Sequence, residues 1–277
     1  MPELPEVEIT RRHLAEATIG RAITEAEVNH PRTARHNASQ DEIENRLRDR
    51  TVTKIGRHGK FLVWSLDDGQ SLVAHLGMSG RFRVASPETE TEKHTHFVAH
   101  LDDGSEVRFI DPRTFGFIAV FDEDELSDSS LSRLGPDAWL DPPDLSTFAN
   151  SLSQRTAPIK ALLLDQAPLA GLGNIYADEV LHLAGIHPST PGGHIGRKEL
   201  ETLLSAVNDV LRQAIDSGGT TLDDLSYLLP DGRAGDNFGR LSVYGRESQE
   251  CPKCGSEIER IVIRSRSTFF CPNCQSL

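Results

Sequence analysis

The sequence predicts an α+β protein: an N-terminal β-sandwich that begins with a helix, a C-terminal helical domain, and a final zinc-binding hairpin. Three observations predict this. Residues 20–120 contain eight short strand-like segments, residues 159–217 have helical apolar spacing, and all four cysteines lie in the last 27 residues. A chain of 277 residues is long enough for about two domains, and 37% apolar residues suffice to pack their cores.

The elements follow in chain order. A helix is expected at about residues 3–17, and DDG sequences at 67–69 and 102–104 favour hairpin turns. Short strands at this spacing are typical of a sandwich. The expected strands are ITEAEV, TVTKIG, FLVWSL, SLVAHLG, RFRVA, HFVAHL, EVRFID and FGFIAVF.

Domain boundaries follow from changes in composition. The Pro- and Asp-rich stretch at 135–147 is interpreted as a linker. We therefore expect an N-terminal β-sandwich domain at 1–134, a helical domain at 148–240 and a zinc finger at 241–277.

Charge and composition exclude several classes of protein. No apolar run approaches the ~20 residues that span a bilayer, and MPELPEVE lacks the apolar region of a signal peptide. The net charge of −13 argues against a nucleic-acid partner, since phosphate binding needs a basic surface. Part of the excess is clustered at 88–92 and 122–128, which we interpret as solvated loops, so any DNA site must rely on local cations.

The cysteines form two CxxC pairs, Cys251 with Cys254 and Cys271 with Cys274, separated by sixteen residues. Two such turns can complete a tetrahedral shell of four thiolates, which is typical of one structural zinc ion. The alternatives are two disulfides or a redox dithiol. A closed site of this kind would support folding rather than catalysis.

The stretch between the cysteine pairs, residues 258–270, predicts a hairpin with Arg264 and Arg266 at its tip. Two arginines there could contact phosphate or could simply lie in a solvated turn; position alone does not decide.

The N-terminus offers a candidate nucleophile. Removal of Met1 would leave Pro2 with a secondary amine, which is far less protonated at neutral pH than lysine and can form an iminium ion with an aldehyde carbon. Glu3 and Glu6 lie within one helical turn, which makes both candidate active-site residues. The alternative is a helix start with proline and acidic residues in its first turn.

The two ends together resemble the formamidopyrimidine-DNA glycosylase (Fpg, MutM) family of bacterial base-excision repair enzymes, and the resemblance extends over the whole chain. The opening PELPE resembles Fpg itself rather than the sister endonuclease VIII group. The matching internal segments are GKFLV (59–63), HLGMSG (75–80), KHTH (93–96), DPRTFG (111–116), GLGNIYADE (171–179), GIHP (185–188), GGTTL (218–222), VYGR (243–246) and RSTFFCPNC (266–274).

The resemblance implies a glycosylase that is also an AP lyase. It implies that Pro2 attacks the sugar C1′ and that Glu3 donates a proton to the sugar or leaving base. It also implies that Lys60 is the acid of the first elimination and a phosphate partner, and that Arg266 serves the second elimination. The expected substrates are oxidised purines, namely formamidopyrimidines and 8-oxoguanine.

The resemblance also implies a DNA interface. Met78, Arg113 and Phe115 would fill the hole left by the flipped nucleotide, although most Met and Phe residues are core residues. The remaining expected contacts are His94, Arg155, and Asn174 of a helix–two-turn–helix motif. Without the family context, the histidine could be a core group and the motif an ordinary helix–helix corner.

Partner and location follow from the same resemblance. We expect one zinc ion, damaged double-stranded DNA as partner, no membrane, a monomer, and a place in the bacterial cytoplasm with the nucleoid.

The chain departs from the family pattern in places. Thr114 stands where many members have arginine, Asp178 adds a carboxylate near the expected phosphate site, and residues 230–240 match the lesion-recognition loop only loosely. The alternatives are a relative that prefers other oxidised bases, a catalytically silent damage-binding relative, and a zinc-ribbon binding protein outside the family.

Overall fold

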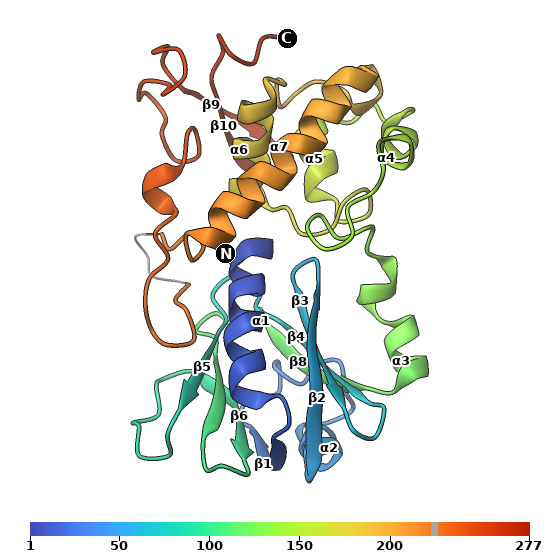
Figure 1. Ribbon diagram of the computed structural model, residues 1–277, viewed down its shortest axis with the longest axis vertical. Coiled ribbons are helices and arrows are strands. Elements are labelled where there is room, and N and C mark those ends of the chain that lie inside the picture. The colour runs from blue at the N-terminus through green and yellow to red at the C-terminus, as the bar shows by residue number, and fades with distance from the viewer. Residues whose placement is uncertain (223–226) are drawn as a thin grey trace. The chain divides into compact units, whose positions relative to one another are not determined.

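The computed structural model describes residues 1–222 and 227–277 (Figure 1). The chain forms two compact units. Unit 1 comprises Met1–Ser132 and Ser217–Phe238, and unit 2 comprises Arg133–Asp216 and Gly239–Leu277. No helix among the described residues is long and apolar enough to cross a membrane.

Unit 1 begins with helix α1 (Leu4–Thr18). Pro5 in its first turn has no N–H to leave unsatisfied, and the Glu6 carboxylate accepts a hydrogen bond from the Glu3 N–H, which completes the N-terminal cap. The apolar side chains Leu4, Val7 and Leu14 are fully buried. Helix α1 contacts strands β2, β3 and β5 (Figure 1), so the predicted N-terminal helix is confirmed.

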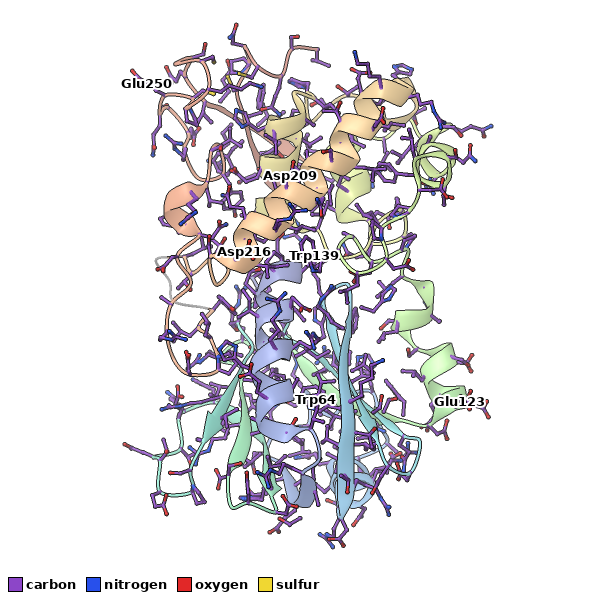
Figure 2. The ribbon with its side chains drawn as sticks, viewed as in Figure 1. Trp64, Glu123, Trp139, Asp209, Asp216 and Glu250 are labelled. Carbon is purple, nitrogen blue, oxygen red and sulfur yellow. The ribbon has the colours of Figure 1, made fainter. Side chains whose placement is uncertain are left out.

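The eight predicted strands form one antiparallel sheet, which curves into a sandwich-like arrangement in the order β5-β7-β6-β1-β2-β3-β4-β8. Inward-facing side chains of both halves share one core, and Trp64, labelled in Figure 2, belongs to it. The strands are β1 (Ala22–Val28), β2 (Arg50–His58), β3 (Phe61–Leu66), β4 (Ser71–His75), β5 (Arg81–Ala85), β6 (Thr95–Leu101), β7 (Glu106–Ile110) and β8 (Phe117–Phe121).

Two short helices of unit 1 were not predicted: α2 (Gln40–Leu47) and α3 (Glu123–Asp128). The second replaces the solvated loop expected at 122–128. Asp122 and Glu125 form a reciprocal capping box there, and acidic residues in the first turn match the helix dipole. A 3₁₀ turn, η1 (Ser130–Arg133), follows.

Residues Ser217–Phe238 belong to the compact unit of the sandwich, although the sequence places them in the helical domain. The Thr220 N–H donates to the Glu6 carboxylate at 2.8 Å, and the Val84 N–H donates to the carbonyl of Pro230. Tyr227 packs with Ile9 of α1. The returning segment therefore joins the start of α1 through contacts 214 residues apart in sequence.

Unit 2 is helical, with a terminal hairpin. Helix α6 contacts α5, α7 and β10, and α4 contacts α7. The predicted linker at 135–147 is packed against this unit, since Gly135 and Ala138 donate backbone hydrogen bonds to the carbonyls of Gln166 and Ala170. The elements are α4 (Leu145–Leu152), α5 (Ile159–Leu164), α6 (Asn174–Ala184), η2 (Gly192–His194), α7 (Arg197–Asp216), β9 (Glu259–Ile263) and β10 (Arg266–Phe270). A last 3₁₀ turn, η3 (Phe238–Arg240), lies where the chain passes from unit 1 to unit 2.

Candidate active site and nucleic-acid interface

The start of α1 places Pro2, Glu3 and Glu6 together. Pro2 is buried, and Glu3 and Glu6 are each 1% exposed. Glu6 accepts two backbone hydrogen bonds of 2.8 Å, one from Glu3 and one from Thr220. Two carboxylates therefore lie within one helical turn of the proline. The capping function of Glu6 agrees with the interpretation of this segment as a helix start with acidic residues in its first turn. It is also compatible with a catalytic function of the segment.

Lys60 lies in the two-residue turn between β2 and β3. Gly59 precedes it with φ +56°, the left-handed conformation that suits glycine at the first central position of such a turn. Lys60 is half-buried. Burial first, and then the charges of Lys60 and Arg35, lower the pKa of His75 to about 4. Lys60 thus acts electrostatically on the segment that leads to Met78.

The loops that carry Met78, Arg113 and Phe115 are locked to each other. The carboxylate of Asp111 accepts hydrogen bonds from the Ser79 hydroxyl and from the Gly116 N–H, each at 2.7 Å. The two loops touch so closely that a Cβ on Gly77 would lie 2.4 Å from the Gly116 nitrogen. The structure therefore brings the three expected wedge residues onto one rigid pair of loops.

Phe115 is 42% exposed, which excludes the core interpretation for this ring. The Arg113 guanidinium lies 5.1 Å from the centroid of the Phe115 ring, and the Arg32 guanidinium lies 5.9 Å from the same centroid. Arg35 donates to the Phe115 carbonyl at 2.9 Å. Met78 is half-buried and is not part of the sandwich core. An exposed aromatic ring among arginines suits contact with unstacked bases and phosphates.

His94 and His96 differ in environment. His96 is buried, with Nε2 3.1 Å from the carbonyl oxygen of Asp111. His94 is half-buried and has φ +68°, and its carbonyl accepts from the Asp111 N–H. His94 is therefore the more exposed residue of the pair.

In unit 2, Asn174 begins α6 and binds the terminal hairpin. Its Nδ2 donates to the Ser267 carbonyl at 3.0 Å. Arg264 and Ser265 form the hairpin turn, with φ values of +45° and +64°. Arg266 is exposed and is the first residue of β10, so it lies beside the turn rather than at its tip. The same backbone stretch thus links the candidate phosphate ligand Asn174 to the candidate catalytic Arg266.

Asp178 differs from its expected role as an added carboxylate at the phosphate site. Its side chain is fully buried and lies 2.8 Å from the Lys160 ammonium, which is also fully buried. Lys160 donates to the Ser267 carbonyl, and the Phe269 N–H donates to Asp178. The charge of Asp178 is therefore neutralised inside unit 2, and the ion pair holds strand β10. The sequence held no indication of this pairing.

Arg155 lies just before α5 and is exposed. Its carbonyl accepts from the Gly193 N–H at 2.8 Å, which fixes its backbone while its side chain faces solvent. Thr114 has φ +54° in the loop between Arg113 and Phe115. The exposed side chain of Arg155 is compatible with the expected contact with DNA.

The four cysteine sulfurs lie within 4.8 Å of one another, which fits a tetrahedral zinc shell. Gly255, with φ +78°, follows the first pair and donates its N–H to the Cys251 carbonyl. His182 of α6 lies 3.4 Å from the Cys251 sulfur and was not predicted. Glu179 was also missed; its carboxylate accepts three backbone hydrogen bonds from residues 242–244.

Comparison with known proteins agrees with this geometry. The chain matches the formamidopyrimidine-DNA glycosylase N-terminal domain over residues 1–118, the H2TH domain of the same enzymes over 134–226, and a zinc finger found in FPG and IleRS over 248–277. It is 43% identical to formamidopyrimidine-DNA glycosylase of Chloroflexus aurantiacus, over 99% of this chain and 98% of that protein. It is 36% identical to that of Bacillus subtilis, over 100% and 99%.

Solved structures are similar over their full length. The complex of Lactococcus lactis Fpg with DNA containing an abasic site has a TM-score of 0.91 and 34% identity, and MutM with DNA containing carbocyclic 8-oxo-G has 0.90 and 33%. In both cases 100% of each chain is covered. The predicted fold and family are confirmed, and the chain belongs to the formamidopyrimidine-DNA glycosylase family.

Proposed function

We propose that this protein is a bifunctional DNA glycosylase and AP lyase that removes oxidised purines from double-stranded DNA. The observation that carries the proposal is the buried Pro2 at the start of α1, with the Glu3 and Glu6 carboxylates beside it. The family membership supports it, as do similar proteins solved with DNA that contains Fapy-dG or an abasic site.

The chemistry begins with the secondary amine that Pro2 acquires when Met1 is removed. The nitrogen attacks the sugar C1′, the bond from C1′ to the base breaks, and the base leaves with a proton. Glu3 protonates the sugar or the leaving base, the ring opens, and nitrogen and C1′ form an iminium ion.

Strand cleavage follows because the iminium acidifies the C2′ protons. Loss of one C2′ proton expels the 3′ phosphate, and a second elimination expels the 5′ phosphate. Lys60 is the proposed acid and phosphate partner of the first elimination, and Arg266 serves the second. Proton transfer by a positioned side chain contributes about 10²–10⁴-fold to such steps.

DNA binding supplies access to C1′. Met78, Arg113 and Phe115 occupy the space of the extruded nucleotide, and His94, Arg155 and Asn174 bind the backbone. The four cysteines are proposed to hold one structural zinc ion, which orders the hairpin of Arg266 and takes no part in the chemistry. The protein is proposed to act as a monomer in the bacterial cytoplasm, at the nucleoid.

Borohydride trapping tests this function. The protein, with Met1 removed, is incubated with an abasic duplex and reductant, and the covalent adduct is measured by gel shift and peptide mass. Pro2→Gly should reduce trapping, and a form that retains Met1 should abolish it. Pro5→Ala, a matched proline of the same helix, should trap normally. Normal cleavage by the form that retains Met1 would overturn the assignment.

Lesion preference forms a second part of the test. Solved relatives were bound to DNA that contains Fapy-dG, carbocyclic 8-oxo-G or an oxidised pyrimidine. Single-turnover rates with each lesion, opposite each base, should be fastest for the oxidised purines. A preference for oxidised pyrimidines would favour the alternative of different specificity, and tight binding without any adduct would favour a silent damage-binding protein.

A further inference from the structure

A buried ion pair outside the residues named above connects α1 to the turn of Lys60. The carboxylate of Glu8 lies 3.2 Å from Nε of Arg57, and the two side chains are 2% and 0% exposed. The same guanidinium donates from Nη1 to the carbonyl of Gly59 at 2.8 Å. Arg57 therefore joins the helix to the residue that directly precedes Lys60.

Glu8 is the centre of a larger network. Arg11 donates to both of its oxygens at 2.9 Å, and Arg12 donates to one of them at the same distance. Burial opposes the charge of Glu8, but the hydrogen bonds from Arg11 and Arg12 and the charge of Arg57 outweigh it and hold the pKa of Glu8 below its usual value. Glu8 is thus ionised at neutral pH and binds Arg57 as a full charge.

Such a pair is a costly way to stabilise a fold. Removing two charges from water opposes their attraction, and well-packed apolar residues of similar volume are often as stable or more so. A planar guanidinium does, however, bind two acceptors in a defined geometry. Arg57 uses this property on the carboxylate of the helix and on the carbonyl of the turn.

The two ends of this connection carry the proposed chemistry. Glu8 lies on the helix that begins next to Pro2 and Glu3, and Gly59 occupies the first central position of the turn whose second is Lys60. A rotation of α1 about its axis would shift the nucleophile relative to the lysine. The contacts from Glu8 to Arg57 and from Arg57 to Gly59 resist that rotation.

We propose that Glu8 and Arg57 are positioning residues that hold the Lys60 turn in register with the catalytic start of α1. This proposal rests on the proposed function, because it assigns them to the step in which Lys60 acts. The proposal assigns neither residue a contact with the reacting atoms, because their effect is transmitted through the Gly59 carbonyl.

The test is the single-turnover rate of β-elimination on an abasic duplex, measured beside the DNA dissociation constant and the thermal melting curve. Arg57→Lys keeps the charge but loses the two-acceptor geometry, and should slow elimination at least about tenfold with little change in DNA binding. Arg12→Gln removes a donor to the other Glu8 oxygen, Oε1, while Arg57 binds Oε2. Arg12 does not reach the turn, and this variant should stay within about twofold of the wild-type rate.

A double-mutant cycle distinguishes a positioning role of Arg57 from a non-specific structural effect of its substitution. If Arg57 acts through Lys60, Arg57→Lys should slow elimination less than about twofold in a Lys60→Ala background. If Arg57→Lys does not fold, Glu8→Gln takes its place in the same cycle, because glutamine retains a carbonyl acceptor for Arg57. The proposal would be overturned if the rate effects of Arg57→Lys and Lys60→Ala multiply in the double variant, or if Arg57→Lys alone has the wild-type elimination rate. Failure of the wild-type protein to form the Pro2 adduct would instead overturn the proposed function.

Discussion

His75 is expected to remain neutral well below the pH at which an ordinary histidine becomes charged. Burial and the charges of Lys60 and Arg35 lower its pKa to about 4. Its Nδ1 accepts a hydrogen bond from the Gly77 N–H at 3.1 Å, and its ring stacks on Phe117. Protonation of Nδ1 would replace this acceptor with a donor, and so would weaken the turn that leads to Met78.

The sign and size of the effect follow from linkage. The folded pKa lies below the ordinary value of 6.5, so between pH 6.5 and pH 4 the unfolded state binds more protons and stability falls as the pH falls. A pKa difference of this size corresponds to a loss of about 2 kcal/mol of unfolding free energy between pH 7 and pH 5. Solvent screening of the half-buried ring reduces this to about 1–2 kcal/mol.

The assay has two parts. In NMR of histidine-labelled protein, the His75 ring should titrate near pH 4, and Lys60→Met should raise that midpoint because a positive charge is removed. In urea titrations, His75→Gln should lose about 1–2 kcal/mol less stability than wild type between pH 7 and pH 5. The exposed His194→Gln serves as control. A His75 midpoint at its ordinary 6.5 would refute the reasoning.

Three further outcomes are expected. Lys160→Met leaves the buried Asp178 carboxylate without its counter-ion and should destabilise unit 2 by about 3–5 kcal/mol in urea titrations. A second substitution, Asp178→Leu, should largely restore this stability. Equal destabilisation in the double variant would contradict the prediction. Gly77→Ala forces a Cβ to within 2.4 Å of Gly116 at a φ of +62°, and should cost about 1–3 kcal/mol of thermal stability and weaken DNA binding; an unchanged melting curve would argue against the locked loops. Cys271→Ser should reduce zinc content, DNA affinity and strand cleavage together, while the far-UV circular dichroism changes little. Normal cleavage by a zinc-free variant would contradict the proposed role of the hairpin residue Arg266.

Local pattern predicted much of this fold because the responsible interactions are close in sequence. Alternating apolar residues and DDG turns located the strands, and CxxC spacing brought four sulfurs within 4.8 Å. The helix at 123–128 was missed because a run of acidic residues suggested a solvated loop. Its capping box, Asp122 with Glu125, was visible in the sequence and outweighs the repulsion among those charges.

Contacts between distant segments could not be predicted in this way. The bond from Thr220 to Glu6 joins residues 214 apart, and the bond from Lys160 to Ser267 joins residues 107 apart. Spacing within a segment carries no information about such partners. Asp178 shows the consequence: its charge suggested a repulsive group at a phosphate site, whereas a buried lysine from a neighbouring helix neutralises it.

The distribution of ion pairs explains how a chain of net charge −13 can present a surface for DNA. Several arginines, such as Arg57 and Arg108, are buried and bound to carboxylates. Among the residues that the structure describes, Arg113, Arg155 and Arg266 form no ion pair, and all three are exposed. Counterion release depends on the cations that meet phosphates and not on the net charge of the chain. Carboxylates therefore bind the buried structural arginines, whereas the arginines assigned to DNA form no ion pair among the described residues.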